Sequence, residues 1–221
     1  MKIVAINASP RVSWNTASLV GEAARGAESE GAEVRKFDLY KSEKFTGCIS
    51  CFGCKLPEHQ GVCIYNDGLS PVLEEIRNAD GLIIGTPNYL GDVSAAFRAL
   101  YERLVFQSLT YKTEPQSYNE RKIPILFIMT SNCPEEFYSQ IGYDKMLENY
   151  QNTLSGVVGP TRVMICGDTL QANDYGKYNW SMFDADAKKK RHDEVFPRDM
   201  EKALMLGKEM VKEPWKGQAQ E

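Results

Sequence analysis

Four of the six cysteines stand close together in the first third of the chain. Cys48, Cys51 and Cys54 are separated by two residues each, and Cys63 follows after a gap of eight residues. Thiolates at this spacing can converge on one metal centre, and iron–sulfur clusters take four cysteine ligands from compact runs of this kind. Structural zinc draws pairs of ligands from separated turns, so it fits this pattern less well. Free or disulfide-exchanging thiols are the third interpretation.

The segment from residue 8 to 16 is the second candidate site, because it is rich in hydroxyl and amide side chains and opens into a helical pattern. A helix N-terminus offers unpaired backbone N–H groups and a positive dipole end, which suits a phosphate. Further donors are Ser9, Arg11, Ser13, Asn15 and Thr16. The glycine patterns of dinucleotide-binding loops and of ATP or GTP P-loops are absent here. The alternative is a loop that only caps the helix.

The elements that must position these residues alternate along the chain. Apolar runs predict strands at residues 2–7, 32–39, 81–85, 123–130 and 161–166. Helical spacing predicts helices at residues 16–30, 69–78, 95–107, 143–155 and 198–212. This order predicts an α/β fold with a doubly wound, five-stranded parallel sheet. We expect one domain over residues 1–212, with a cysteine-bearing loop inserted at 41–67, and a polar C-terminal tail at 213–221.

Two segments carry a resemblance to a known family. Ser9-Pro10-Arg11 with Asn15-Thr16 is similar to the phosphate loop of the NADPH-dependent FMN reductases. The segment 85–95 resembles the Pro-x-Tyr-x-Gly loop of that family, with Ala79-Asp80 before it and Tyr101-Glu102-Arg103 after it. The resemblance covers the first 105 residues or so. It implies a flavodoxin-like fold that binds FMN at the carboxyl ends of the strands, where the topological switch point lies.

The same resemblance implies which residues surround the flavin. A second loop would contact the ring through Thr86, Pro87, Asn88, Tyr89, Leu90 and Gly91. A third loop would lie beside the ring with Thr130, Ser131 and Asn132, although it lacks the glycines common in the family. Hydride transfer to a flavin requires no acid or base from the protein, so we assign no catalytic side chain.

The cysteine run resembles that of the iron–sulfur flavoproteins, a branch of the same superfamily. This implies a [4Fe–4S] cluster, held by Cys48, Cys51, Cys54 and Cys63, that exchanges electrons with FMN. The last gap is longer than usual in that branch, and Pro57 and Gly61 could form an extra turn within it. We expect a ferredoxin-type or NAD(P)H electron donor, a small-molecule acceptor and a homo-oligomer (dimer or tetramer). The alternatives are a cluster-free NAD(P)H:FMN or quinone reductase and a flavodoxin-like binding module that holds zinc.

Composition and the remaining residues exclude several other classes. A net charge of −4 gives no basic excess for nucleic acid, and no apolar run is long enough for a membrane span. No leader pattern precedes the first strand, so we expect a cytoplasmic protein. We interpret His59 as a solvated loop residue, Cys166 as a buried apolar side chain and the basic run 188–191 as an exposed face. The role of Cys133, in the third loop, stays open.

Overall fold

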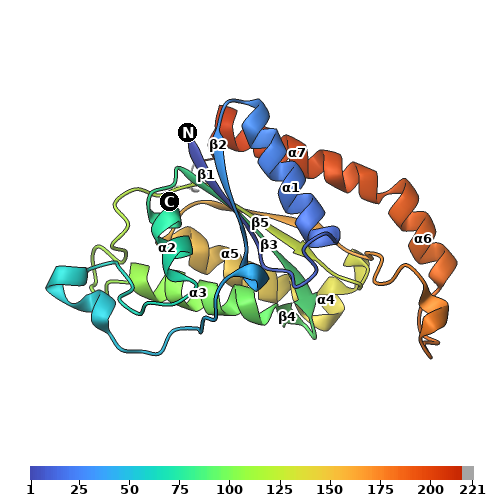
Figure 1. Cartoon of the computed structure of the whole chain (residues 1–221), viewed down its shortest axis with the longest axis horizontal. Helices are drawn as coiled ribbons and strands as arrows, with labels where there is room; N and C mark the ends of the chain where they lie inside the picture. The colour runs from blue at the N-terminus through green and yellow to red at the C-terminus, as the bar shows by residue number, and fades with distance from the viewer. Residues whose placement is uncertain (216–221) are drawn as a thin grey trace.

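The computed structural model describes residues 1–215, and its centre is a sheet of five parallel strands (Figure 1). The strands are β1 (Lys2–Asn7), β2 (Glu33–Asp38), β3 (Gly81–Tyr89), β5 (Ile125–Thr130) and β6 (Thr161–Cys166). Their order across the sheet is β2-β1-β3-β5-β6. The chain thus moves outward from β1 to β2 and then crosses back to the other side of β1. This confirms the doubly wound, flavodoxin-like fold with five parallel strands.

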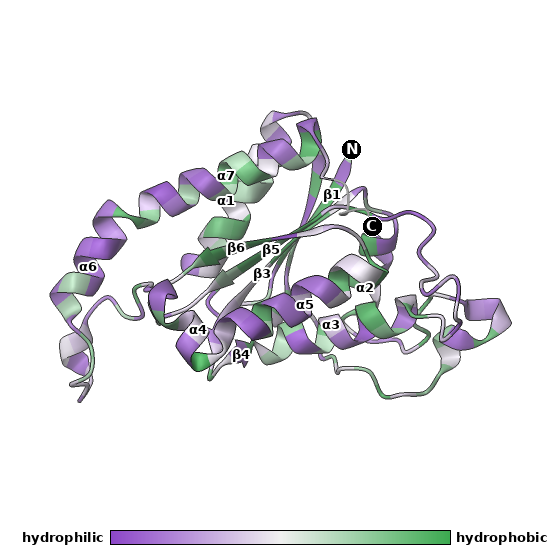
Figure 2. Cartoon of the chain, turned by 180° about the vertical axis from the view of Figure 1, so that it is seen from behind, coloured by the Kyte–Doolittle hydropathy of each residue, from purple (hydrophilic) through white to green (hydrophobic). Residues whose placement is uncertain are grey.

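Helices cover both faces of the sheet (Figure 1). One face carries α1 (Asn15–Ser29) and α7 (Phe196–Lys212), and the other carries α2 (Ser70–Arg77), α3 (Ala95–Ser108) and α5 (Tyr143–Val157). In β1, Ile3 and Ala5 pack with the first pair of helices, whereas Val4 and Ile6 pack with the other group, because successive side chains of a strand point to opposite faces. Figure 2 shows the apolar strands enclosed between helices with hydrophilic outer sides.

The structure contains several short elements that the sequence did not predict. The two-residue strand β4 (Asp92–Val93) pairs antiparallel with the end of β3, which continues to Tyr89 rather than ending at Gly85. Helices α4 (Tyr138–Ile141) and α6 (Ala185–Glu194) are also additional. Short 3₁₀ turns lie at Leu39–Lys41, Gly53–Lys55, Pro57–His59, Glu135–Phe137 and Tyr175–Lys177. Among the described residues, no helix combines the length and the apolar composition needed to cross a membrane.

The interpretation of the basic run 188–191 as an exposed face is wrong for two of its four residues. Lys188 is buried and Arg191 is half-buried on one side of α6. They form ion pairs with Asp168 and Asp199, which lie outside that helix. The two lysines between them are exposed. One side of the run is therefore turned inward and held by ion pairs, and the other side faces solvent.

The C-terminal segment, up to Trp215, packs against the rest of the fold. The ring of Trp215 is buried, its indole N–H donates to the carbonyl of Pro160 at 2.8 Å, and Arg162 lies over the ring. Residues 216–221 of the predicted tail lie outside the described residues.

Helices α1 and α7 approach each other closely through two reciprocal glycines. A methyl group at Gly26 would lie 2.0 Å from the carbonyl oxygen of Leu204, and one at Gly207 would lie 1.9 Å from that of Ala23. Both obstacles are backbone atoms, which cannot rotate away. The contact therefore requires glycine at both positions.

We predict that Gly207→Ala lowers the free energy of unfolding by about 1–3 kcal/mol, because the added methyl group forces the two helix backbones apart. The matched control is Gly21→Ala in α1, where a methyl group would meet nothing within 4 Å. That control should be neutral or stabilise the protein by up to about 1 kcal/mol through helix propensity. Urea denaturation followed by circular dichroism measures both changes, and equal effects would contradict this account of the helix contact.

Candidate functional site

Three loops that are far apart in the sequence meet at the carboxyl edge of the sheet. They follow β1, β3 and β5, which are neighbours in the strand order. The backbone N–H of Ala8 donates to the carbonyl of Gly85 at 2.8 Å, and the hydroxyls of Thr16 and Thr130 are hydrogen-bonded at 2.7 Å. The first loop is thus joined directly to both others, at the switch point where ligands bind in sheets of this topology.

The N-terminus of α1 is open toward this edge. The capping position is Trp14, whose side chain makes no capping hydrogen bond. Within residues 1–215, the backbone N–H groups of residues 15–17 donate to no protein acceptor. Free N–H groups at the positive end of a fifteen-residue helix are a donor set suited to an anion such as a phosphate.

The side chains predicted for this loop mostly hold its shape. The Ser9 hydroxyl accepts from the backbone N–H of Arg11 at 3.1 Å, and the Asn15 amide donates to the carbonyl of Leu170 at 2.8 Å. Arg11 donates to the carbonyl of Gln171 at 2.7 Å and lies over the ring of Trp14. Ser13 is exposed. The backbone N–H groups of residues 15–17 and the hydroxyls of Ser9 and Ser13 are therefore left as donors.

The second loop is a tight turn that presents apolar side chains. Asn88 accepts from the backbone N–H of Gly91 at 3.1 Å, and Leu90 and Gly91 both have left-handed backbone with φ of 56° and 90°. Tyr89 and Leu90 are exposed, which leaves flat apolar surface at the strand ends. Thr86, in contrast, is fully buried and bonded to the Ser94 backbone, so it supports the loop from within.

A single hydroxyl, that of Ser94, ties the second loop to the first. It donates to the carbonyl of Ala8 at 2.6 Å and accepts from the backbone N–H of Phe97 at 3.3 Å, which makes it the N-cap of α3. The Thr86 hydroxyl lies within 3.3 Å of it. Ser94 is completely buried, so no water competes for these bonds.

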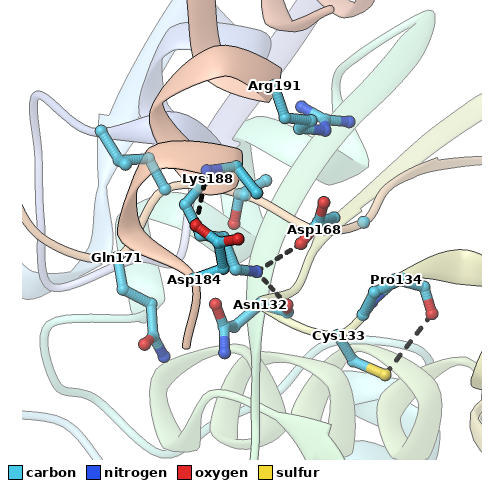
Figure 3. A network of polar contacts seen from close by, with 12 residues as sticks. Asn132, Cys133, Pro134, Asp168, Gln171, Asp184, Lys188 and Arg191 are labelled. Atoms are coloured by element: carbon cyan, nitrogen blue, oxygen red, sulfur yellow. Dashed lines mark hydrogen bonds and ion pairs between the residues drawn. The ribbon is translucent and has the colours of Figure 1, made fainter. Parts of the chain in front are cut away.

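The third loop is held from below by α6. Figure 3 shows the amine of Lys188 donating to the carbonyl of Asn132 at 2.6 Å and pairing with the carboxylate of Asp168. Thr130 and Ser131 are buried, and the Ser131 hydroxyl is bonded to that of Tyr138 at 2.6 Å. The side chain of Asn132 is left with a buried oxygen that has no protein partner among the described residues.

Neither Lys188 nor Asp168 is among the residues that the sequence predicts for the site. Their place beneath the third loop depends on how α6 docks, and no element was predicted there from the sequence. The only available signal was Asp184, a capping residue that accepts from the backbone N–H of Ala187 at 2.9 Å at the start of α6.

Cys133 and Cys166, which lie outside the run of four cysteines, have different surroundings. Cys166 is fully buried, as expected, but its thiol donates to Asp199 at 3.2 Å. Burial raises the pKa of the Cys166 thiol strongly, with the Asp199 charge acting in the same direction. Burial also raises the pKa of Cys133, which is half-buried. Both thiols are therefore poor nucleophiles at neutral pH.

Cys48, Cys51, Cys54 and Cys63 line one pocket against the side of α3. Two side chains of that helix fix the loop there. Glu102 accepts from the backbone N–H of Cys48 at 3.3 Å, and Gln107 accepts from that of Cys63 at 3.0 Å. The first and last cysteines of the run are thereby brought to the same helix face.

The backbone between the cysteines bends through left-handed residues. Ser50 and Phe52 have φ of 54° and 57°, which costs energy in residues other than glycine. The eight-residue gap forms a compact turn around Pro57–His59, closed where Gly61 donates to the carbonyl of Cys54 at 3.1 Å. This confirms the extra turn expected from Pro57 and Gly61, and His59 is exposed on it as predicted.

Lys55 fastens this loop to the end of α3. Its amine donates to the carbonyls of Phe106 and Leu109, the latter at 2.5 Å, and lies near the rings of Phe106, Tyr111 and Tyr118. A cation at the carbonyl end of a helix is favoured by the dipole. Burial raises the pKa of the neighbouring Cys54 thiol, Lys55 opposes that change, and Cys63 and Cys48 add to it.

The three joined loops and the open N-terminus of α1 together form the candidate site at the carboxyl edge of the sheet. A model of the NADPH-dependent FMN reductase family matches residues 1–132. The chain belongs to this family. The family expected from the two sequence motifs is therefore confirmed.

Curated proteins similar to this family member are named iron–sulfur flavoproteins. One from Methanocaldococcus jannaschii is 36% identical over 103 residues, which are 47% of this chain and 51% of the relative. One from Methanosarcina thermophila is 32% identical over 105 residues, 48% of this chain and 53% of the relative. The chain therefore spans about half the length of the curated relatives it matches.

Solved structures resemble the chain over nearly its whole length. An NAD(P)H:quinone oxidoreductase from Methanothermobacter marburgensis has a TM-score of 0.67 at 13% identity, with 95% of this chain and 96% of that one covered. An azoreductase from Bacillus anthracis has a TM-score of 0.66 at 12% identity, with 95% and 99% covered. At these identities the likeness establishes the fold.

We predict that Ser94→Ala lowers the free energy of unfolding by about 1–3 kcal/mol, because it removes an N-cap and leaves the buried Ala8 carbonyl without its donor. It should also weaken binding of added FMN, since the first and second loops lose one of their direct ties and keep only the backbone bond from Ala8 to Gly85. Ser139→Ala, at an exposed position of α4, is the control. Urea denaturation and flavin fluorescence titration provide the measurements, and wild-type values for both would contradict this role of Ser94.

We predict that Lys55→Met lowers the free energy of unfolding by about 1–2 kcal/mol, because two helix-end carbonyls lose a charged donor while the apolar stem is kept. Backbone amides of residues 52–63 should exchange hydrogen faster, since the loop is less firmly attached to α3. Lys44→Met, in the same loop but exposed, serves as the matched control. Hydrogen exchange followed by mass spectrometry tests this, and unchanged exchange in that segment would rule the anchor out.

Proposed function

We propose that the chain is an FMN-dependent oxidoreductase that also holds a [4Fe–4S] cluster and transfers electrons between the two groups. Its family membership supports the flavin, and the names of its relatives support the cluster. FMN, when bound, accepts two electrons together and releases them singly, whereas a cluster carries one at a time. The rest of the proposal concerns what the residues of this chain do.

The observation that carries the flavin site is the open N-terminus of α1 beside the second and third loops. The unpaired N–H groups of residues 15–17 would hold the phosphate of FMN. The exposed turn at Tyr89 and Leu90 would provide apolar contact for the ring, with Pro87, Asn88 and Gly91 shaping it. Asn132 would approach from the third loop with its unpartnered oxygen. Ser9, Arg11, Ser13, Thr16, Thr86, Thr130 and Ser131 complete the proposed site.

The cysteine pocket fits the proposed cluster by its donor set. Four thiols border one small pocket, and four thiolates are what an iron–sulfur cluster requires. Within the described residues, no three cysteine, histidine or acidic side chains are already at metal-ligand spacing, so a metal would draw the thiols inward. Both groups would bind along α3, with about 12 Å of helix between Ala95 and Arg103.

The electron donor and acceptor are part of the proposal. Similar structures include an NAD(P)H:quinone oxidoreductase and an FMN-dependent NADH-azoreductase, which favours NAD(P)H as donor and a small molecule as acceptor. A ferredoxin-type protein is the alternative donor, because a cluster accepts single electrons. We also propose a homo-oligomer, a dimer or tetramer, as the functional form. The exposed side chains of Tyr178, Trp180 and Met182, on the segment between β6 and α6, offer apolar surface for such a contact.

We predict that anaerobically purified protein contains FMN, iron and acid-labile sulfide, and that Cys51→Ala loses the iron and sulfide while it keeps FMN. Cys51 is exposed, so its replacement removes a ligand without leaving a core cavity. Cys133→Ala, outside the cysteine pocket, is the control and should retain the wild-type iron content. Metal analysis, sulfide assay and the visible spectrum give the answer.

Other metal and flavin contents of the purified protein would point to other functions. Stoichiometric zinc without iron would contradict the cluster and favour a structural metal. Flavin without any metal would identify a cluster-free NAD(P)H:FMN or quinone reductase. Absence of flavin, even after reconstitution with FMN, would contradict both redox functions and leave a flavodoxin-like binding module.

A further inference from the structure

Arg103 is the largest side chain that the fold buries completely, with 1% of its surface exposed. It projects from α3 into the pocket lined by the four cysteines. Its two terminal amino groups are occupied, because one pairs with the carboxylate of Asp67 and the other donates to the carbonyl of Tyr65 at 2.5 Å. Both acceptors come shortly after Cys63 in the chain, so the guanidinium holds the end of the cysteine loop against the helix.

The third nitrogen of this guanidinium, Nε, is buried and its N–H has no acceptor among the described residues. A buried donor without a partner costs about 1–3 kcal/mol, so an unused N–H beside a ligand-type pocket requires an explanation. Asp67 and Cys63 both favour the charged guanidinium, and against the effect of burial they raise the pKa of Arg103. Asp67, which accepts from Arg103 and from two backbone N–H groups, has a lowered pKa although burial opposes it.

We propose that Arg103 donates its Nε–H to the sulfur-ligated group in the cysteine pocket, at the Cys63 thiolate or an adjacent inorganic sulfide, and thereby raises the reduction potential of that group. This inference rests on the proposed cluster. Reduction adds one negative charge to a cluster, and a hydrogen bond to its sulfur stabilises the more negative state. The Asp67 carboxylate offsets much of the positive charge, so the directional N–H bond supplies most of the effect.

Lys55, the other cation near the cysteines, is held at the end of α3, where its amine donates to the carbonyls of Phe106 and Leu109. Its amine has protein partners, whereas Nε of Arg103 is buried without one among the described residues. Arg103 is therefore distinguished by a buried donor without an acceptor rather than by charge alone. This leads to opposite expectations for two substitutions.

We expect Arg103→Lys to lower the midpoint potential of the cluster while the FMN potential stays unchanged. Lysine keeps the charge beside Asp67 but has no Nε–H in the guanidinium plane. The expected loss is about tenfold in the equilibrium constant for reduction, which is ~59 mV for one electron. Asp67→Asn should shift the potential upward, since the guanidinium charge is then less compensated. The amide oxygen of asparagine can still accept from the backbone N–H of Leu69, and the bond from Thr46 to the other carboxylate oxygen is lost.

Spectroelectrochemical titration of the anaerobic holoprotein, with the cluster and flavin bands followed separately, measures these shifts. Arg25→Lys, on α1 across the sheet, is the control and should leave both potentials unchanged. Arg103→Lys with wild-type iron and an unchanged potential would overturn the inference but leave the proposed function intact. If Arg103→Lys does not fold, Asp67→Asn decides, and an unchanged or lower potential overturns the inference. Wild-type protein without iron and sulfide would overturn the proposed cluster itself.

Discussion

The hydroxyl of Ser94 is the contact on which both candidate sites depend. It joins the first loop through Ala8 and starts α3 through Phe97, and the second loop supplies Thr86 beside it. Because α3 is one continuous helix from Ala95 to Ser108, this contact also determines where Glu102, Arg103 and Gln107 meet the cysteine loop. The position of one site relative to the other is therefore set by one helix and its cap.

The two proposed sites would recognise their ligands by different physical means. At the end of β1 the backbone would supply most of the donors, and the side chains of Ser9, Asn15 and Thr16 keep that backbone in position. In the cysteine pocket the ligating atoms would be side chains, and the backbone that carries them is left-handed at Ser50 and Phe52. A substitution in the first site would act mainly through loop geometry, whereas one in the second would remove a ligand directly.

The sequence was a good guide where local pattern and tertiary position coincide. The buried strand 125–130, apolar up to Met129, and the polar loop before α1 were predictable, because a central parallel strand and a helix start leave direct signals. The third loop was not, since its support comes from Lys188 on a helix without an apolar face. Arg103 was recognisable only as part of a family motif. Its buried pairing with Asp67 links positions 36 residues apart, and no local periodicity reports such a contact.

The attachment of the cysteine loop bears on how the mature protein would be assembled. Lys55, Glu102 and Gln107 hold the loop through bonds that involve no metal, unlike small zinc domains that remain unfolded until the metal binds. The polypeptide can thus complete its fold first and receive a cluster afterwards as an already organised acceptor. Maturation would then be a late, surface-accessible event, with the exposed Cys51 as the point of entry.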